Sequence, residues 1–335
     1  MTERPAILVT GGAGFIGSHA CKALAQAGFL PVVLDNLSTG HADAVQWGPG
    51  VIADIRDRVA LARVMDTYNI SAVMHFAGSA YVHESMIDPA KYYDNNIGGL
   101  LALLAVLRQQ DVMPPVVFSS SCATYGLKAL VPIAETAAQQ PINPYGRTKL
   151  VCEWMLADHA AAYGLRPAIL RYFNAAGADP DGKLGERHQP ETHLIPLALM
   201  AAAGLRPALD VYGADYETPD GTCVRDYIHV NDLARAHVMA LSQLLQGSAG
   251  LTVNLGSGQG VSVLEVVAAV ERVTGKSVAL NRMPRRAGDP PILVADPSLA
   301  SQLLGFRTKV SDIETIIGHA APWFGHKVAG DAEAA

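Results

Sequence analysis

The feature that most constrains the fold is a glycine-rich turn that joins an apolar run to an amphipathic stretch. Residues 6–10 predict a buried β-strand, and Gly11, Gly14 and Gly17 follow it at fixed spacing. Gly11 permits a tight turn, Gly14 lets the backbone approach a diphosphate, and Gly17 lets helix and strand pack closely. The free amide groups at the helix N-terminus favour phosphate binding. A glycine triplet alone is weak evidence, but the strand–turn–helix context favours a nucleotide site over a simple helix-entry turn.

Short apolar runs alternate with longer amphipathic stretches over the first 175 residues. We predict strands at 6–10, 31–35, 51–53, 72–76, 115–118 and 168–171, and helices at 19–28, 56–69, 92–110 and 145–163. Apolar strands separated by helices indicate a parallel sheet that is covered on both faces. The predicted fold class is therefore α/β, with a doubly wound parallel sheet of the Rossmann type.

The alternation of apolar runs and amphipathic stretches ends after residue 175, where loops rich in Gly, Asp and Pro begin. We expect residues 1–175 to form the nucleotide-binding domain and residues 176–330 to form mainly a smaller C-terminal lobe. Segments near 225–260 are expected to return to the first domain, with residues 253–255 as a seventh strand. Residues 331–335 are expected to be a frayed tail.

Composition and charge exclude several function classes. The chain has a net charge of −6, whereas nucleic-acid binders usually carry a basic excess, so no nucleic-acid partner is expected. No apolar run reaches the roughly 18 residues of a membrane span. The four cysteines lie far apart, which is typical of core thiols in a reducing compartment and favours the cytoplasm. His188, His229 and His237 lack ligand-like spacing, so we expect no metal.

Asp35 ends the second predicted strand and bears on cofactor choice. A carboxylate at this position accepts hydrogen bonds from the adenosine ribose hydroxyls and repels a 2′-phosphate, which favours NAD over NADP. Asp35 is also typical of a turn, because Asn36 and Ser38 follow it. Both interpretations are compatible.

Three polar residues on two later elements suggest proton chemistry. Tyr145 and Lys149 are four residues apart at the start of a predicted helix and therefore share one face. A nearby ammonium is expected to lower the pKa of a tyrosine from about 10, so that it serves as base and acid near neutral pH. Ser121, at the end of the fifth strand, can hold a substrate hydroxyl beside Tyr145. Each signal alone is common, but their order on the predicted elements is specific.

On these motifs the chain resembles the extended short-chain dehydrogenase/reductase family, whose glycine motif and Tyr-x-x-x-Lys motif match 10–17 and 145–149. Further segments narrow the resemblance to the UDP-glucose 4-epimerases of that family, and they lie at 34–41, 75–78, 92–96, 171–178, 191–196, 220–230, 254–258 and 284–289. The resemblance extends from about residue 5 to about residue 325.

The resemblance implies an isomerase that interconverts UDP-glucose and UDP-galactose through a 4-keto sugar, with NAD retained as the hydride carrier. It implies that Tyr145 is the base, that Ser121 positions the reacting oxygen, and that Lys149 tunes Tyr145. The implied cofactor contacts, besides Tyr145 and Lys149, are Gly11, Gly14, Phe15, Ile16, Gly17, Asp35, Asn36, Leu37, Ser38, Thr39, Gly40, Asp54, Ile55, Phe76, Ala77, Gly78, Asn95 and Phe173. The implied UDP-sugar contacts are Ser121, Tyr145, Asn174, Thr192, His193, Tyr212, Arg225, Arg286 and Asp289.

The two arginines of that set have a physical basis of their own. UDP is anionic while the protein is acidic overall, so local arginines must hold the diphosphate. Arg225 and Arg286 are the candidates. The competing interpretation is a surface salt bridge, which for Arg225 would involve the neighbouring Asp226.

Several alternatives share the fold. A 4-epimerase of another UDP-sugar, such as UDP-N-acetylglucosamine, UDP-xylose or UDP-arabinose, or UDP-glucuronate, would use the same catalytic groups. A 4,6-dehydratase would need an acidic pair where Cys122 and Ala123 stand. A non-catalytic NAD-sensing module is disfavoured by the intact Ser121, Tyr145 and Lys149. The family resemblance also implies a homodimer built on the helices at 92–110 and 145–163, although burial within one chain would explain the same apolar faces.

Overall fold

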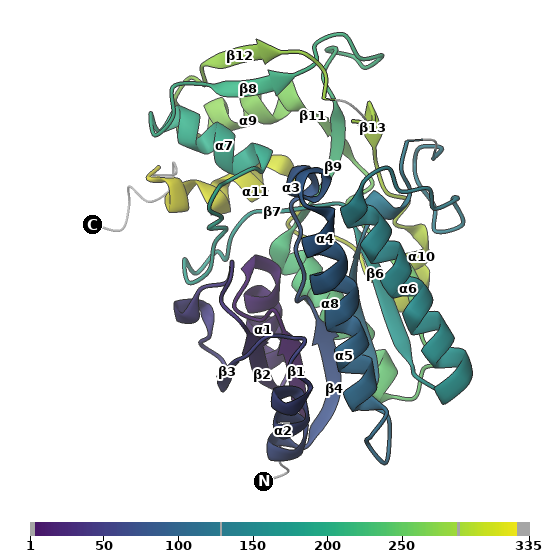
Figure 1. Cartoon of the computed structure of the whole chain (residues 1–335). Helices are drawn as coiled ribbons and strands as arrows, with labels where there is room; N and C mark the ends of the chain where they lie inside the picture. The colour runs from purple at the N-terminus through teal and green to yellow at the C-terminus, as the bar shows by residue number, and fades with distance from the viewer. Residues whose placement is uncertain (1–3, 128, 287–288, 327–335) are drawn as a thin grey trace.

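A seven-stranded parallel sheet forms the centre of the main body (Figure 1). The protein is described by a computed structural model that covers residues 4–127, 129–286 and 289–326. From one edge to the other the strands are β10 (Leu251–Leu255), β6 (Pro167–Tyr172), β5 (Val116–Ser121), β4 (Ile70–His75), β1 (Ala6–Thr10), β2 (Leu30–Asp35) and β3 (Gly50–Ile52). The doubly wound α/β fold is confirmed, and so is the seventh strand, which pairs in parallel with β6.

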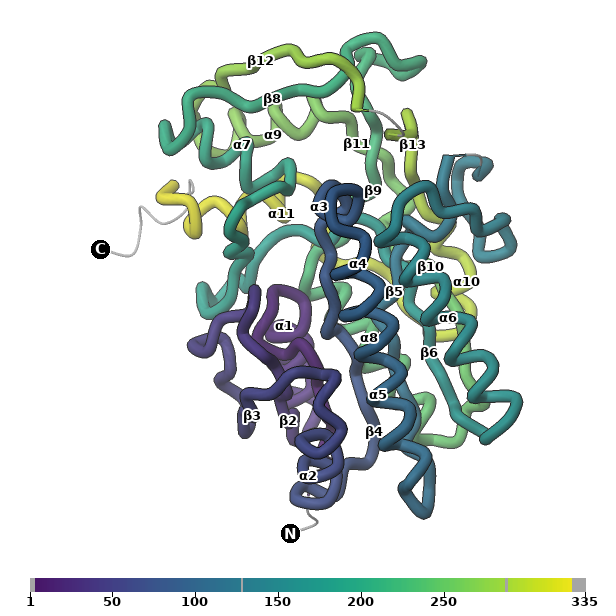
Figure 2. The backbone as a smooth tube through the Cα atoms, in the orientation of Figure 1, coloured from purple at the N-terminus to yellow at the C-terminus, as the bar shows by residue number. Residues whose placement is uncertain are grey.

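Helices cover both faces of this sheet, as Figure 2 shows along the backbone. One face packs against α2 (Arg58–Tyr68), α5 (Gly98–Leu107) and α6 (Pro144–Tyr163), and the other packs against α1 (Phe15–Gln26), α8 (Val230–Leu245) and α10 (Ser298–Leu304). Within β1, Leu8 joins the first core while Ile7 and Val9 join the second. This alternation between two buried faces explains why the strand is apolar at every position.

The smaller lobe lies above the carboxyl ends of the central strands in the view of Figure 1. Its strands are β7 (Asn174–Ala176), β9 (Val224–His229), β11 (Gly260–Ser262) and β13 (Ile292–Leu293), together with the separate parallel pair of β8 (Leu209–Tyr212) and β12 (Leu280–Met283). Its helices α7 (Leu194–Ala202), α9 (Val263–Thr274) and α11 (Ile313–Ala320) enclose a third apolar core.

The returning part of the chain differs in extent from the predicted 225–260. β9 belongs to the sheet of the smaller lobe, and the return to the main body begins with α8 and continues through β10. A further return, which includes α10 and Phe306, was not predicted, because its short apolar pattern resembles that of the lobe. The expected frayed tail at 331–335 lies outside the described residues. Among those described, no helix is both long and apolar enough to cross a membrane.

Two predicted helix boundaries were wrong. The helix predicted at 92–110 is α4 (Pro89–Tyr92), a π-helical turn (Tyr93–Ile97) and α5, preceded by the short α3 (Val82–Ile87). π-helical turns are frequent at functional sites, and this one turns Asn95 and Asn96 toward the loop after β4. Helix α1 begins at Phe15 rather than at residue 19. The placement of Ser121 at the end of the fifth strand is confirmed, and the serines of β5 pair with β6.

Candidate active site

A large cleft opens where the carboxyl ends of the central strands meet the smaller lobe. Its volume is about 1470 Å³, and both parts of the protein line it. Ligands of open α/β sheets bind at this edge. Nearly all the residues implied by the family resemblance line this cleft, and the exceptions are Leu37, Gly40 and Asp54.

The glycine turn is shaped by close backbone approach. Gly11 adopts a φ of +73°, and a Cβ there would lie 2.6 Å from the backbone nitrogen of Ala77. A Cβ on Gly17 would lie 2.2 Å from the carbonyl oxygen of Gly11. At Gly14 the nearest atom to an added Cβ is 3.4 Å away, so this residue borders open space. Among the residues that the structure describes, no side chain caps α1, so its first amide groups are available to an anion in the cleft.

Asp35 holds the glycine turn against the end of β2. Its carboxylate accepts hydrogen bonds from the amides of Ala13 at 3.0 Å and Leu37 at 2.8 Å. Leu37 has a φ of +59°, which marks a tight turn. Asp35 therefore has the turn role, and its carboxylate also borders the cleft, where it remains available to a ribose.

Two of the three predicted residues outside the cleft lining have clear structural roles. A Cβ on Gly40 would lie 3.0 Å from Ala13, so this glycine allows the two turns to approach. Asp54 forms a 2.7 Å ion pair with Arg56 and accepts a 3.2 Å hydrogen bond from Asn36. Arg56 holds the pKa of Asp54 well below its usual range. Asp54 is thus a charged group at the rim of the cleft.

The three proposed reacting groups converge in the cleft. Ser121, Tyr145 and Lys149 are all buried, yet each borders the cleft. The Tyr145 side chain projects from the first turn of α6, whose N-cap is Asn143. The Lys149 ammonium lies 5.9 Å from the centre of the Tyr145 ring, one helical turn further on. The spacing-based prediction that these groups share one helix face is confirmed.

The expected effect of Lys149 on Tyr145 is wrong for the protein alone. Burial raises the pKa of Tyr145 above its usual value, Tyr172 adds to this rise, and Ser121 opposes it. Burial also lowers the pKa of Lys149 to about 8. Desolvation penalises the charged forms of both side chains, and it is the largest cause of each shift. The cleft without a ligand therefore favours the neutral phenol.

A buried ionic network fixes the elements that carry these groups. Glu153, one turn beyond Lys149 on α6, forms a 2.6 Å ion pair with Arg171 of β6. The Glu153 carboxylate also accepts a 2.5 Å hydrogen bond from the hydroxyl of Ser120. Because Ser120 precedes Ser121, this network sets the distance between strand β5 and helix α6. Sequence analysis missed it, since the pairing spans three separate elements.

The predicted diphosphate arginines lie in the part of the cleft nearest the smaller lobe. Arg225 forms a 2.5 Å ion pair with Asp289, not with Asp226. The Asp226 carboxylate points inward, where it accepts hydrogen bonds from the amides of Ser257, Gly258 and Ala295. Asp226 therefore does not compete with an anion for Arg225.

Three more predicted substrate contacts border the same part of the cleft. The Arg286 guanidinium stacks 3.8 Å from the centre of the Tyr212 ring. The side-chain amide of Asn174 donates a 2.8 Å hydrogen bond to the carbonyl oxygen of Asp226. All three residues line the cleft. Arg286 therefore presents a planar cation whose orientation is fixed by an aromatic ring.

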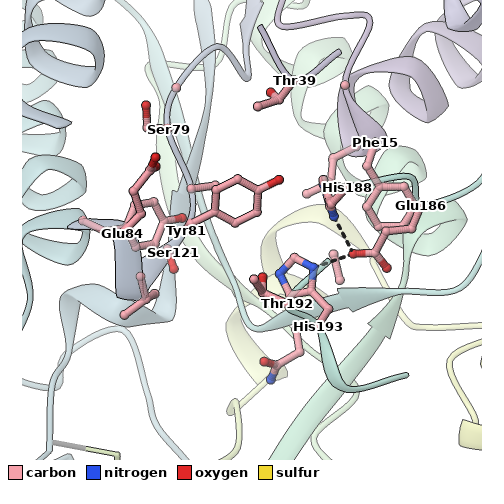
Figure 3. Close-up of a pocket in the computed structure, with 18 of the residues that line it drawn as sticks. Phe15, Thr39, Ser79, Tyr81, Glu84, Ser121, Glu186, His188, Thr192 and His193 are labelled. Atoms are coloured by element: carbon pink, nitrogen blue, oxygen red, sulfur yellow. Dashed lines mark ion pairs between the residues drawn. The ribbon is translucent and has the colours of Figure 1, made fainter. Parts of the chain in front are cut away.

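A loop before α7 brings further polar groups into the cleft (Figure 3). Thr192 and His193 were predicted there, but Glu186, His188 and Glu191 were not. His188 contacts the rings of Phe15 and Tyr81 edge-on. The repeated Glu-x-His pattern at 186–188 and 191–193 was a signal that could have identified this group. Tyr172, whose hydroxyl lies 2.5 Å from the Ser119 hydroxyl, was also missed although it ends a central strand.

Comparison with known proteins places this geometry in a family. The model described as the NAD dependent epimerase/dehydratase family matches residues 7–256. The chain belongs to this family.

Its relatives specify the resemblance further. The chain is 50% identical over 317 residues to the UDP-glucose 4-epimerase of Rhizobium leguminosarum bv. trifolii, covering 95% of this chain and 96% of the relative. It is 60% identical to the solved UDP-glucose 4-epimerase of Brucella ovis in complex with NAD, with a TM-score of 0.95 and coverage of 97% and 100%. A Stenotrophomonas maltophila UDP-glucose-4-epimerase with bound NAD and formylated UDP-arabinopyranose is 45% identical, with a TM-score of 0.91 and coverage of 96% and 98%. The resemblance to UDP-glucose 4-epimerases is confirmed.

Proposed function

We propose that this protein is an NAD-dependent isomerase that interconverts UDP-glucose and UDP-galactose at sugar carbon 4. The observation that carries the proposal is the convergence of Ser121, Tyr145 and Lys149 in one cleft with the glycine turn and two arginines. The three reacting groups typical of a dehydrogenase and the two arginines that could bind an anion thus lie in the same cleft. The relatives named UDP-glucose 4-epimerase support this choice of substrate.

The residues present fit NAD. Gly14 borders open space beside the uncapped N-terminus of α1, which suits a diphosphate, and the Asp35 carboxylate suits a ribose without a 2′-phosphate. Further along the cleft, Phe76 to Gly78 and Asn95 supply the lining at the end of β4. Bound oxidised NAD supplies a positively charged ring and a reversible hydride acceptor.

Tyr145 is proposed as the group that moves the proton. As a phenolate, Tyr145 takes the proton of the sugar 4-hydroxyl and becomes the neutral phenol, and it later returns that proton, while Ser121 holds the reacting oxygen. Burial disfavours the phenolate in the protein alone, so the base needs positive charge in the cleft. Lys149 supplies part of that charge from its position behind Tyr145. The reaction therefore requires Tyr145 and Lys149 to act together.

The far end of the substrate is proposed to be held by Arg225 and Arg286. Binding a diphosphate there costs Arg225 part of its pairing with Asp289, but Arg286 carries no carboxylate partner among the described residues. Anchoring at the UDP end confines the sugar to the cleft and still permits the 4-keto sugar to rotate, so that its other face is presented. That turn is required for the hydride to return to the opposite face.

An assay with purified protein tests the proposal. UDP-galactose is added, and the appearance of UDP-glucose is followed by proton NMR. We expect conversion to a stable mixture of both sugars and no conversion by Tyr145→Phe. UDP-N-acetylglucosamine, UDP-xylose and UDP-glucuronate are tested in parallel. Turnover of one of these with none of UDP-galactose would assign the site to the other sugar, and NAD-loaded protein that turns over none would overturn the proposal.

We also propose a homodimer that acts in the cytoplasm. Leu101 on α5 and Trp154 on α6 are 48% and 58% exposed, although both helices otherwise pack on the sheet. Large apolar side chains exposed on two adjacent helices favour burial against a second copy of the same face. All four cysteines are free and buried, which suits a reducing compartment.

A further inference from the structure

Four side chains from one loop point at a common position on the wall of the cleft. We call Glu186, His188, Glu191 and His193 the loop cluster. One carboxylate oxygen or imidazole nitrogen of each lies within 4.8 Å of those of the other three. Figure 3 shows both imidazoles directed at the same oxygen of Glu186. The proposed epimerase chemistry does not require this convergence.

The spacing of these atoms matches a set of ligands around one ion. The Oε1 atom of Glu186 lies 2.5 Å from Nδ1 of His193 and 3.1 Å from Nδ1 of His188. The carboxylate of Glu191 lies 3.5 Å from Nδ1 of His193 and 3.7 Å from Nδ1 of His188. Four ligands at about 2.1 Å from a tetrahedral zinc ion are about 3.4 Å apart. The separations of 3.1, 3.5 and 3.7 Å lie near that value, whereas the 2.5 Å contact is a hydrogen-bond distance that would lengthen when an ion binds.

Unpartnered atoms within the cluster also point to an ion. The Glu186 side chain is only 4% exposed, yet its Oε1 has no aligned hydrogen-bond donor among the described residues. Nδ1 of His188, which lies 3.1 Å from that oxygen, makes no aligned hydrogen bond with any described residue either, so the two atoms form an ion pair only. Buried polar atoms in proteins are nearly always satisfied. A cation between these atoms would satisfy both at once.

We propose that the loop cluster is a binding site for one divalent transition-metal ion of the zinc type. Two imidazoles and two carboxylates are a borderline-soft set, which suits zinc and cobalt better than magnesium or calcium, since the latter prefer oxygen ligands. All four protein ligands would be used, so the site is closed and structural rather than catalytic. Its effect is to fix the loop that carries Thr192 and His193 at the cleft.

Charge balance also fits a divalent ion. Two carboxylates and two neutral imidazoles carry two negative charges in total, and one divalent ion neutralises them.

The experiment adds cobalt(II) chloride to the chelator-treated, full-length protein with its NAD retained. We expect one cobalt ion per chain, with the visible d–d absorption of a four-coordinate site, and displacement by zinc. His188→Gln and Glu191→Gln should each weaken cobalt binding at least about tenfold. Loss of a residue that only hydrogen-bonds a metal ligand already costs about that much, and loss of a ligand itself should cost no less. His159→Ala, which removes a histidine from α6 away from the cleft, is the control and should bind normally.

Several outcomes would overturn the proposal. These are an absence of d–d absorption with wild-type protein, unchanged binding in both glutamine variants, or equal loss in His159→Ala. Any of them would leave the loop cluster as a network of ion pairs only. Because two variants are used, misfolding of one, judged by circular dichroism and NAD content, still leaves the other as a test. The readout is metal binding and does not depend on the proposed epimerase activity.

Discussion

Lys149 donates a 2.7 Å hydrogen bond to the carbonyl oxygen of Ser119. This bond ties the middle of α6 to the end of β5, the strand that also carries Ser121. The ion pair between Glu153 and Arg171, with the bond from Ser120, adds a second connection one turn further along. The three reacting groups are therefore held by one rigid unit rather than by mobile loops.

Replacing Tyr145 by Phe should remove turnover and preserve binding. The change deletes only the hydroxyl that exchanges the proton, and proton transfer by a positioned group typically contributes about 10²–10⁴-fold to the rate. We expect kcat to fall by at least about 10²-fold, while the dissociation constant for UDP stays within a factor of about 3. Steady-state kinetics and calorimetric titration with UDP measure the two quantities. A near wild-type kcat would show that another group is the base.

Lys149 should make stability depend on pH. Burial lowers the pKa of Lys149 to about 8 in the folded protein, against about 10.4 in an unfolded chain. Between these values the unfolded state binds more protons, so the contribution of this group to the free energy of unfolding rises with pH and is lost as pH falls toward 8. The full difference corresponds to about 3 kcal/mol.

Denaturant unfolding from pH 7.5 to 10 measures this effect as the difference between wild type and Lys149→Met. We expect wild-type stability to rise relative to that of the variant across this window. Lys276→Met, which removes an exposed lysine instead of a buried one, is the matched control. A flat difference for Lys149→Met would mean that its ammonium is not destabilised by burial.

Asp35→Ala should reduce the preference for NAD over NADP. The carboxylate that repels a 2′-phosphate is lost, and so are its bonds to the amides of Ala13 and Leu37. We expect the ratio of the dissociation constants for NADP and NAD to change by about tenfold or more. A tenfold change corresponds to about 1.4 kcal/mol. Fluorescence titration of NAD-depleted protein measures it. Asp66→Ala, an exposed change on α2, is the matched control, and equal ratios in wild type and Asp35→Ala would contradict the ribose role.

Arg286→Ala should raise KM for the UDP-sugar in a salt-dependent way. The guanidinium is held on the Tyr212 ring and faces the cleft, so its loss removes an attraction that salt partly screens. We expect a rise of about tenfold at low salt, corresponding to one charge-assisted hydrogen bond, and a smaller rise at high salt. Arg285→Ala is the neighbouring control, because Arg285 pairs with Asp215 and does not line the cleft. Equal KM values at every salt concentration would place the diphosphate elsewhere.

The apolar face of α5 and α6 should be an interface. Trp154 is 58% exposed on α6, and a charged residue there would be buried without a partner in a dimer. Light scattering coupled to size exclusion should give the mass of two chains for wild type and of one chain for Trp154→Glu. Leu303→Glu, an exposed change on α10 at the opposite face of the sheet, tests whether added negative charge alone has this effect. A monomeric wild type at all concentrations would contradict the proposal.

The sequence predicts well where the chemistry depends on local spacing. The glycine turn, the strand ends and the four-residue step from Tyr145 to Lys149 all follow from one element at a time, and the structure brings these residues together. Long-range partners do not follow. The pairing of Arg225 with Asp289 depends on the path of a loop 64 residues away.

The pKa of Tyr145 shows a second limit. Spacing indicates that Lys149 is near, but it does not indicate how completely water is excluded. Burial reverses the expected direction of the shift, because desolvation is the largest influence on the pKa of the phenol. The π-helical turn at Tyr93–Ile97 is similar, since it arises from contacts of Asn96 with Ser79 and Thr148 rather than from helix propensity.

Retention of label at carbon 4 tests the central claim most directly. UDP-galactose carrying deuterium at carbon 4 is incubated with the protein in ordinary water, and the isolated UDP-glucose is analysed by mass spectrometry and proton NMR. If the hydrogen leaves as a hydride and returns within the same closed cleft, the product keeps its deuterium at carbon 4. Loss of deuterium to solvent would contradict this account, because it would mean that the carbon is inverted by proton exchange instead.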